Sequence, residues 1–197
     1  MSLPGVKPLV REVLPPSKYR EVRDRALRLI SEYKKNRYLD VGRVTVLFED
    51  AVTVWLQIEE TLFLEEELGE ELLKEAVATY LPIVPRRGEV SLTVMVNLFN
   101  EEELRTVLPK FDGIQDSVYI RAGAAGVKAE PIFPEDYGPG ALPRSIHYLK
   151  ARVEPAEGAT LVFRHREINA EVPIPETVLE ALKSSVVAEE VNWTSLL

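Results

Sequence analysis

Two hydrophobic patterns follow each other along the chain, and their order constrains the fold more than any other feature. Through the first part of the chain, apolar residues recur at helical spacing. Many later segments instead alternate between apolar and polar residues, as half-buried strands do. Helices grouped before strands predict an α+β fold. We expect a mostly antiparallel sheet in the C-terminal two-thirds, with helices from the N-terminal third packed on it.

The expected elements follow from these patterns and from their capping residues. Helices are expected at 17–37 with Ser17 as N-cap, 51–68, 70–81, 100–111 with Asn100 as N-cap, and 175–185. Strands are expected at 43–49, 89–99, 117–123, 127–133, 144–153, 159–168 and 170–175. Residues 51–60 also fit the return strand of a hairpin, but the long run of strong helix formers favours the helix.

These elements predict one globular domain over residues 17–187. A chain of 197 residues fits a single domain and can bury a core without disulfides or metal staples. Residues 1–16 contain four prolines and are expected to form an N-terminal arm. Residues 188–197 are expected to form a C-terminal tail that is either loose or docked on a partner.

Composition narrows the partners and the chemistry. Acidic residues outnumber basic ones by 32 to 24, and the net charge is −8, so neither nucleic acid nor a membrane is expected as a partner. No run reaches transmembrane length and no signal peptide is visible, which predicts a cytoplasmic location. The absence of cysteine excludes thiol catalysis and Cys-ligated iron–sulfur clusters. Proline and charged residues are numerous, as in thermophile proteins.

The two histidines lie on two consecutive expected strands, and alternation puts each on the apolar face. The connection 154–158 has a length that suits a hairpin. If Val153 pairs with Ala159, His147 lies opposite His165, with β-carbons about 4.5–5.5 Å apart. A slip of two residues would keep the face and set the two histidines diagonally.

Such a pair of imidazoles has several chemical roles open to it. The histidines could bind a metal, act in acid–base catalysis, or serve as structural groups hydrogen-bonded to buried acids. Glu167 follows on the same face, and Glu59 or Glu60 could reach the sheet from a packed helix. His147, His165, Glu167 and Glu60 are therefore the candidate ligands for iron, manganese or zinc. The structural role is the alternative that we favour.

Other segments carry weaker signals. The acidic run 64–75 is interpreted as a solvated helix face, with a cation or a basic partner as the alternative. The loop 135–144 is rich in Pro and Gly and is either a lid or a connection. The small-residue stretch 121–126 lacks the Lys-Ser/Thr of a phosphate loop, and no G-x-S-x-G, HExxH or GxGxxG motif is present.

Several short stretches within residues 17–185 together resemble an uncharacterised prokaryotic family, domain of unknown function 3501. They include GRVTVLFED at 42–50, TVWLQIEETL at 53–62, EEELRTVLPKFDGI at 101–114 and RSIHYLKARVEP at 144–155. The positions matched to family words, here called the family-matched positions, are Phe48, Glu49, Gln57, Glu60, His147, Tyr148, Leu149, Lys150, Arg164 and His165.

The chain departs from the resemblance at two places. Phe63 stands where the family usually has Arg, and Arg164 stands where it often has Asp. Any ionic network joining those family positions is therefore altered in this chain. The family's association with rubrerythrin-like and iron–sulfur oxidoreductase genes implies a redox-related role and a redox protein as partner.

Two function classes remain after these arguments. The leading hypothesis is a non-catalytic accessory or binding protein, with a protein partner and a homo-oligomer both open. The alternative is a metal-binding protein or metal-dependent enzyme that uses the His147 and His165 site.

Overall fold

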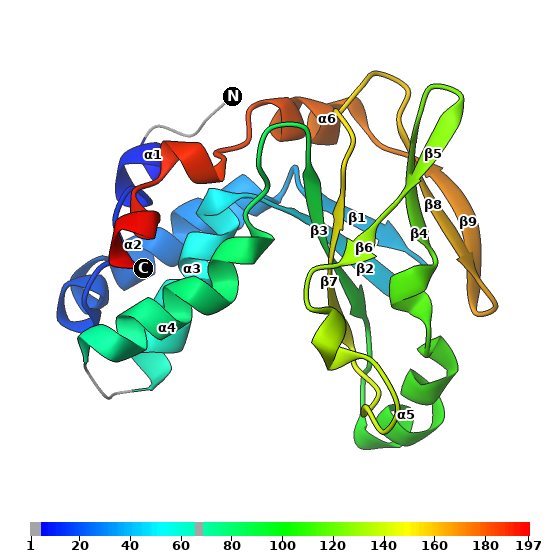
Figure 1. Ribbon diagram of the computed structural model, residues 1–197, viewed down its shortest axis with the longest axis horizontal. Coiled ribbons are helices and arrows are strands. Elements are labelled where there is room, and N and C mark those ends of the chain that lie inside the picture. Colours follow the sequence, from blue (N-terminus) through cyan, green and yellow to red (C-terminus); the bar gives the residue numbers. More distant parts are fainter. Residues whose placement is uncertain (1–4, 66–68) are drawn as a thin grey trace.

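The computed structural model describes residues 5–65 and 69–197, and in it the helices of the N-terminal part gather on one side of two β-sheets (Figure 1). The α+β class is therefore confirmed. No helix in the described residues is long and apolar enough to cross a membrane. The helices are α1 Val6–Leu9, α2 Pro16–Lys34, α3 Ala51–Leu64, α4 Glu70–Tyr80, α5 Glu101–Thr106 and α6 Glu176–Lys183. The strands are β1 Tyr38–Val41, β2 Val44–Glu49, β3 Val90–Val96, β4 Val118–Ala122, β5 Ala125–Lys128, β6 Glu130–Pro131, β7 Ile146–Ala151, β8 Thr160–His165 and β9 Ile168–Pro173.

The strands divide into two antiparallel sheets. The five-stranded sheet, called sheet A, has the order β1-β2-β3-β7-β6, and the four-stranded sheet, called sheet B, has the order β5-β4-β8-β9. The chain crosses from sheet B to sheet A at Ala129, which is fully buried between β5 and β6. The single strand expected at 127–133 is therefore two short strands in different sheets.

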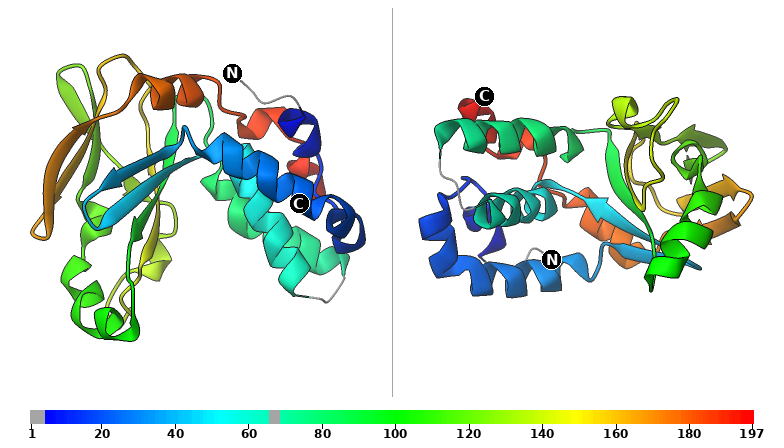
Figure 2. Two further views of the ribbon diagram at one scale, coloured as in Figure 1. Left: turned by 180° about the vertical axis from the view of Figure 1, so that it is seen from behind. Right: turned by 90° about the horizontal axis from the view of Figure 1, so that it is seen from below.

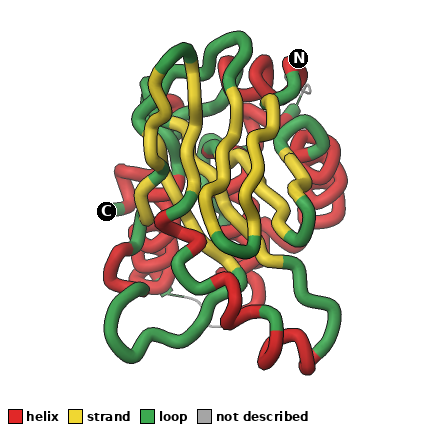
Figure 3. Tube along the Cα trace, turned by 90° about the vertical axis from the view of Figure 1, so that its right-hand side faces the viewer, coloured by secondary structure: helices red, strands yellow, loops and turns green. Residues whose placement is uncertain are grey.

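The two sheets pack their apolar faces together, and Figure 3 shows the pair from the side of sheet B. Phe48, Leu92 and Leu149 are register neighbours across β2, β3 and β7. All three lie in one buried cluster with Leu161 and Phe163 of β8. Because side chains alternate along a strand, the opposite face of sheet A is left for the helices.

Polar contacts join that opposite face to α3, on the helical side of the molecule (Figure 2). The Thr53 hydroxyl of α3 donates to the Glu49 carboxyl of β2, and Thr93 Oγ1 of β3 donates to Glu49 Oε1 at 2.7 Å. Farther along α3, Gln57 Nε2 donates to Tyr148 Oη at 2.7 Å. The helical layer is thus attached to sheet A through specific hydrogen bonds as well as through apolar packing.

The N-terminal arm and the C-terminal tail pack together on the helical layer, where the blue and red segments adjoin in Figure 1. The Trp193 indole of the tail donates to the Val10 carbonyl at 2.9 Å. The Trp55 indole of α3 donates to the Glu12 carbonyl at 2.8 Å. The tail therefore docks on its own chain, whereas residues 1–4 of the expected arm lie outside the described residues.

A buried ion pair ties four parts of the chain together. Arg37 Nη2 lies 3.0 Å from Asp50 Oδ2, and the two side chains are 1% and 0% exposed. Asp50 caps α3 and accepts from the Val186 amide at 3.1 Å. Arg37 also donates to the carbonyls of Phe48 and Ala181, at 3.2 and 2.8 Å. The pair thereby joins the end of α2, β2, the start of α3 and the segment after α6.

The expected hairpin of the two histidine strands is wrong. β7 pairs with β3 and β6 in sheet A, whereas β8 pairs with β4 and β9 in sheet B. The connection between β7 and β8 crosses between sheets, and the tight hairpin is the next one, where His165 pairs with Ile168. Both strands expose an equally apolar face to the core, so alternation fixed the face but not the partner.

The expectations for the starts of individual helices are confirmed at two places and wrong at a third. The helix favoured for residues 51–60 is confirmed, since α3 begins at Ala51 under a capping box of Asp50 and Thr53. Asn100 caps α5 as expected. The N-cap expected at Ser17 is wrong, because α2 begins at Pro16, a residue that suits the first helical turn.

One strand was not anticipated, and one expected segment is only partly described. Strand β1 pairs with β2 across a turn in which Gly42 has a φ of 59°. The acidic run 64–75 includes residues 66–68, which lie outside the described residues, and α4 accounts for its second half.

Removing the buried cation tests the role of the ion pair. We expect Arg37→Met to lower the free energy of unfolding by about 3–5 kcal/mol, because Asp50 then stays buried without its counter-charge. Lys35→Met is the matched control, since its pair with Glu32 is exposed and contributes about 0–1 kcal/mol. Urea denaturation followed by circular dichroism measures both. Equal losses in the two variants would contradict the proposed importance of the buried pair.

Candidate functional site

A cleft of about 420 Å³ opens between the first residues of β3, the last residue of β2 and the segment that follows α6. Residues 85–89, which lead into β3, form one wall. Residues 182–187, at and after the end of α6, form another wall. The cleft therefore exists because the Arg37–Asp50 pair holds the C-terminal segment against the start of α3.

Two polar residues of sheet A line the cleft from inside the fold. Glu49 and Ser91 are register partners on β2 and β3, and they are 4% and 0% exposed. Burial raises the pKa of Glu49, although the hydroxyls of Thr53 and Thr93 that donate to it work in the opposite direction. Burial without a contacting cation favours the neutral acid. The Ser91 hydroxyl has no hydrogen-bond partner among the described residues.

Charged side chains surround the opening. The basic residues are Lys7, Arg86, Arg87 and Lys183, all of them exposed, and the acidic ones besides Glu49 are Glu89, Glu154 and Glu190. Glu89 is engaged by the Arg86 amide at 2.8 Å and by Lys150 at 3.2 Å. The ion pair between Arg87 and Glu190 is long, at 3.8 Å, and both partners reach solvent. The cleft is therefore neutral and polar inside and mixed in charge at its rim.

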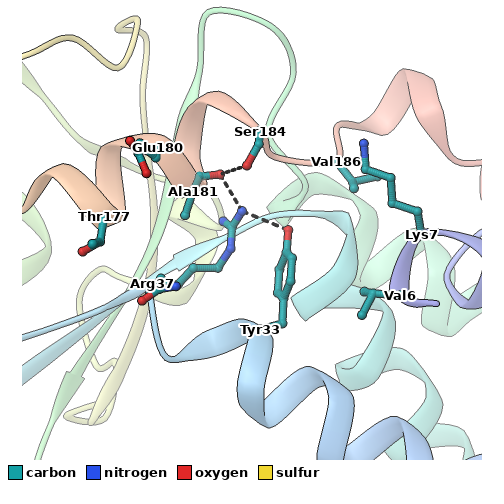
Figure 4. A pocket seen from close by; sticks show the side chains of 10 residues that line it. Val6, Lys7, Tyr33, Arg37, Thr177, Glu180, Ala181, Ser184 and Val186 are labelled. Carbon is teal, nitrogen blue, oxygen red and sulfur yellow. Dashed lines mark hydrogen bonds between the residues drawn. The ribbon is translucent and has the colours of Figure 1, made fainter. Parts of the chain in front are cut away.

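A smaller cavity of about 80 Å³ lies beside α6 and the segment that follows it (Figure 4). Tyr33 and Arg37 line it, and Arg37 Nη2 donates to Tyr33 Oη at 3.0 Å. Ser184 lines both this cavity and the larger cleft. Arg37 Nε is buried and has no partner among the described residues. The segment after α6 thus contributes residues to both the larger cleft and this smaller cavity.

Ser91 is the buried serine of the cleft. The hydroxyl of Ser91 is not hydrogen-bonded to a base within the described residues. Nucleophilic catalysis needs such a base within hydrogen-bonding reach. The cleft instead offers the Ser91 hydroxyl, which is buried and has no hydrogen-bond partner among the described residues.

The structure places His147 among local partners. The Tyr137 hydroxyl lies 2.7 Å from Nδ1, and Nε2 lies 3.0 Å from the Arg144 carbonyl. The carbonyl must accept, so Nε2 carries the proton and Nδ1 accepts from Tyr137. Burial lowers the pKa of His147, and the neutral ring stacks on Tyr137. His147 thereby fixes both ends of the loop 137–144.

Both ring nitrogens of His165, on strand β8, also have hydrogen-bond partners. Nε2 lies 2.8 Å from the Asp112 carbonyl, and Nδ1 accepts from the Glu167 amide at 3.2 Å. The ring stacks on Phe111 with a centroid separation of 6.0 Å. His147 and Asp112 line one small cavity, so the two histidines flank the same segment from different sheets.

The four candidate metal ligands are not brought together. Glu167 lies in the β8–β9 turn beside Arg166, and Glu60 lies in the helical layer, where Arg23 and Tyr19 bind it. Arg23 also stacks over Phe63, at 4.7 Å from the ring centroid. Within residues 5–65 and 69–197, no group of three or more His, Cys, Asp or Glu side chains is arranged to hold a metal ion. The metal hypothesis therefore gains no support from the geometry.

Sequence patterns did not reveal the cleft, although one signal pointed to it. Four family-matched positions, Glu49, Gln57, Tyr148 and Lys150, lie on the helix-facing side of sheet A or on the helix that covers it. Lys150 donates to the carbonyls of Pro82 and Val84. Ser91 carried no signal of its own, because a serine in an alternating strand is ordinary.

The fold and this cleft define an α+β protein with a polar cavity between a helical layer and a two-sheet core. The sequence matches the family described as "Protein of unknown function (DUF3501)" over residues 9–186. Because that match covers most of the chain, the protein belongs to this family.

Comparison with other proteins adds the fold but no activity. A crystal structure of a novel protein of unknown function from Burkholderia pseudomallei K96243 has a TM-score of 0.79 to this chain. The sequences are 24% identical, and the alignment covers 98% of this chain and 100% of that one. No curated protein matches the sequence.

The buried acid of the helical layer gives a test by pH. Glu59 is 0% exposed, accepts from the Leu14 amide at 2.5 Å, and burial raises its pKa to about 8. Between the unfolded pKa near 4.5 and about 8, the folded state holds a proton that the unfolded state lacks, so stability falls as pH rises. We expect Glu59→Gln to gain stability over the wild type by up to about 1.4 kcal/mol per pH unit in this window.

The neighbouring acid is the matched control for that experiment. Arg23 lowers the pKa of Glu60, so Glu60 contributes stability that is lost as pH falls through its folded pKa. Glu60→Gln should therefore alter the stability profile on the acid side and keep most of the slope between pH 5 and 8, because burial raises the pKa of Glu59 more than the charge of Glu60 does. Urea unfolding at a series of pH values measures both variants. A Glu59→Gln profile parallel to the wild type would contradict the assignment.

Proposed function

We propose that this protein is a non-catalytic binding protein that holds a small polar molecule in the cleft beside Glu49 and Ser91. The observation that carries the proposal is the buried Ser91 hydroxyl without a partner among the described residues. Leaving such a group unsatisfied costs about 1–3 kcal/mol. A bound molecule that hydrogen-bonds to it would recover that cost.

Two further features support binding at this place. The cleft volume of about 420 Å³ falls within the range of small-molecule sites. Its walls come from segments distant in sequence, residues 85–89 and 182–187, and the buried Arg37–Asp50 pair helps to hold the second of these in position. A rigid frame of this kind lowers the entropic cost of binding.

The wider role stays a prediction. A binding protein of this kind fits an accessory function, and the redox-related role with a redox protein as partner rests on the family resemblance alone. The cytoplasmic location, the absence of a nucleic-acid partner and the homo-oligomer likewise rest on sequence arguments.

Capture of a small molecule tests the proposal directly. The protein is incubated with a small-molecule extract of cells, separated rapidly by gel filtration, denatured, and analysed by mass spectrometry for released compounds. We expect a compound enriched on the wild type and lost on Ser184→Trp, whose indole would fill the mouth of the cleft.

Ser195→Trp is the control for that substitution. Ser184 and Ser195 are both exposed, and each donates to the carbonyl three residues earlier, but Ser195 is not part of the cleft. The control should retain the compound. The proposal fails if no compound is enriched on the wild type, or if Ser184→Trp retains what the wild type binds.

A further inference from the structure

We infer that the ligand of the cleft is a small hydroxylated anion, with a phosphate or carboxylate group at the basic rim and a hydroxyl group against Ser91. This inference rests on the proposed function, because it specifies the ligand class of the same site. Its support comes from the charge distribution of the rim and from the chemistry of the interior.

The rim gathers basic side chains from three separate segments. Lys7 comes from α1, Arg86 and Arg87 from the residues before β3, and Lys183 from the end of α6. Although the chain as a whole has a net charge of −8, four exposed cations are concentrated around this one opening, alongside the acidic Glu89, Glu154 and Glu190. Such a concentration attracts anions and, through Arg, binds phosphate or carboxylate groups in a bidentate manner.

Two of the four acidic groups that line the cleft are already engaged or favoured as neutral. Glu89 is held by Lys150 and by the Arg86 amide. Glu49 is buried and favoured as the neutral acid. Glu154 and Glu190 remain, and the nearest cation to Glu190 is Arg87 at 3.8 Å. The balance at the opening is therefore positive.

The basic groups are available for a ligand. The guanidinium of Arg86 forms no ion pair within the described residues, although its backbone amide is bonded to Glu89. Within the described residues, Lys183 pairs only with Glu176, at 3.9 Å, and Arg87 only with Glu190, at 3.8 Å. Exposed pairs of that length contribute little, so an anionic ligand could replace them at small cost.

The interior selects the other end of the ligand. Ser91 offers a hydroxyl that can donate and accept, and the residue is the register partner of Glu49 on the neighbouring strand. A ligand hydroxyl is the simplest complement, because it also donates and accepts. A second charged group at this depth would be desolvated without a counter-ion. The expected ligand is therefore charged at one end only.

Titration with defined probes tests the class. Amide resonances of Gly88 and Ser91 are followed by NMR as glycerol 3-phosphate, glycerate, inorganic phosphate, glycerol and ethanolamine are added separately. We expect glycerol 3-phosphate or glycerate to bind, with inorganic phosphate at least about tenfold weaker and the neutral and cationic probes weaker still. The comparison of glycerol 3-phosphate with glycerate identifies phosphate or carboxylate as the preferred anion.

Variants assign the contacts. The double variant Arg86→Gln/Arg87→Gln should weaken binding of the anionic probe about tenfold or more, because charge-assisted hydrogen bonds are lost. Ser91→Ala should weaken glycerol 3-phosphate or glycerate severalfold and leave inorganic phosphate unchanged. Arg28→Gln is the control, since Arg28 is exposed on α2 and does not line the cleft.

The outcomes separate this inference from the proposed function. Binding of glycerol or ethanolamine in the cleft as tight as that of the anions would overturn the ligand class and leave the binding function standing. Anion binding that is unaffected by the arginine double variant would also overturn it. Failure of all five probes, with a compound still captured from the extract, overturns the ligand class alone. The proposed function falls only with the capture experiment.

Discussion

The buried pair of Arg37 and Asp50 is the interaction on which the rest of the architecture depends. A charge removed from water needs a counter-charge and several hydrogen bonds, and here each partner has both. Those partners belong to the end of α2, to β2, to the start of α3 and to the segment after α6. The chain satisfies the two charges only when all four segments meet, so the pair specifies one arrangement of the helical layer against sheet A.

The cleft is a consequence of that arrangement. The C-terminal segment is held by the Asp50 carboxylate and by the Ala51 amide, which donates to the Val186 carbonyl at 2.8 Å. The same segment forms one wall of the cleft and also lines the cavity beside Arg37. Structural polar groups and candidate binding groups are therefore adjacent, yet they differ in one respect. Asp50 is fully hydrogen-bonded, whereas the Ser91 hydroxyl has no hydrogen-bond partner among the described residues.

The histidines show how far local pattern carries a prediction. Alternation correctly put His147 and His165 on the inner faces of their strands, and in the structure both rings have local hydrogen-bond partners. The pairing was wrong because loop length and apolar faces suit more than one neighbour. Once β7 had β3 as a partner and β8 had β4 and β9, the rings lay in different sheets. Each ring nitrogen that could have faced a metal is occupied by Tyr137 or by the Glu167 amide.

Periodicity along the chain was enough to give the α+β class, the helix at Ala51 and the inward side of most strands, because each depends on residues close in sequence. Other features depend on contacts between residues far apart in the chain. These features are the division of the strands into two sheets, the docking of Trp193 on the arm, and the pairing of Glu49 with Ser91 at the cleft. Such contacts form because together they bury the whole core and pair buried charges such as that of Arg37. No short segment contains that information.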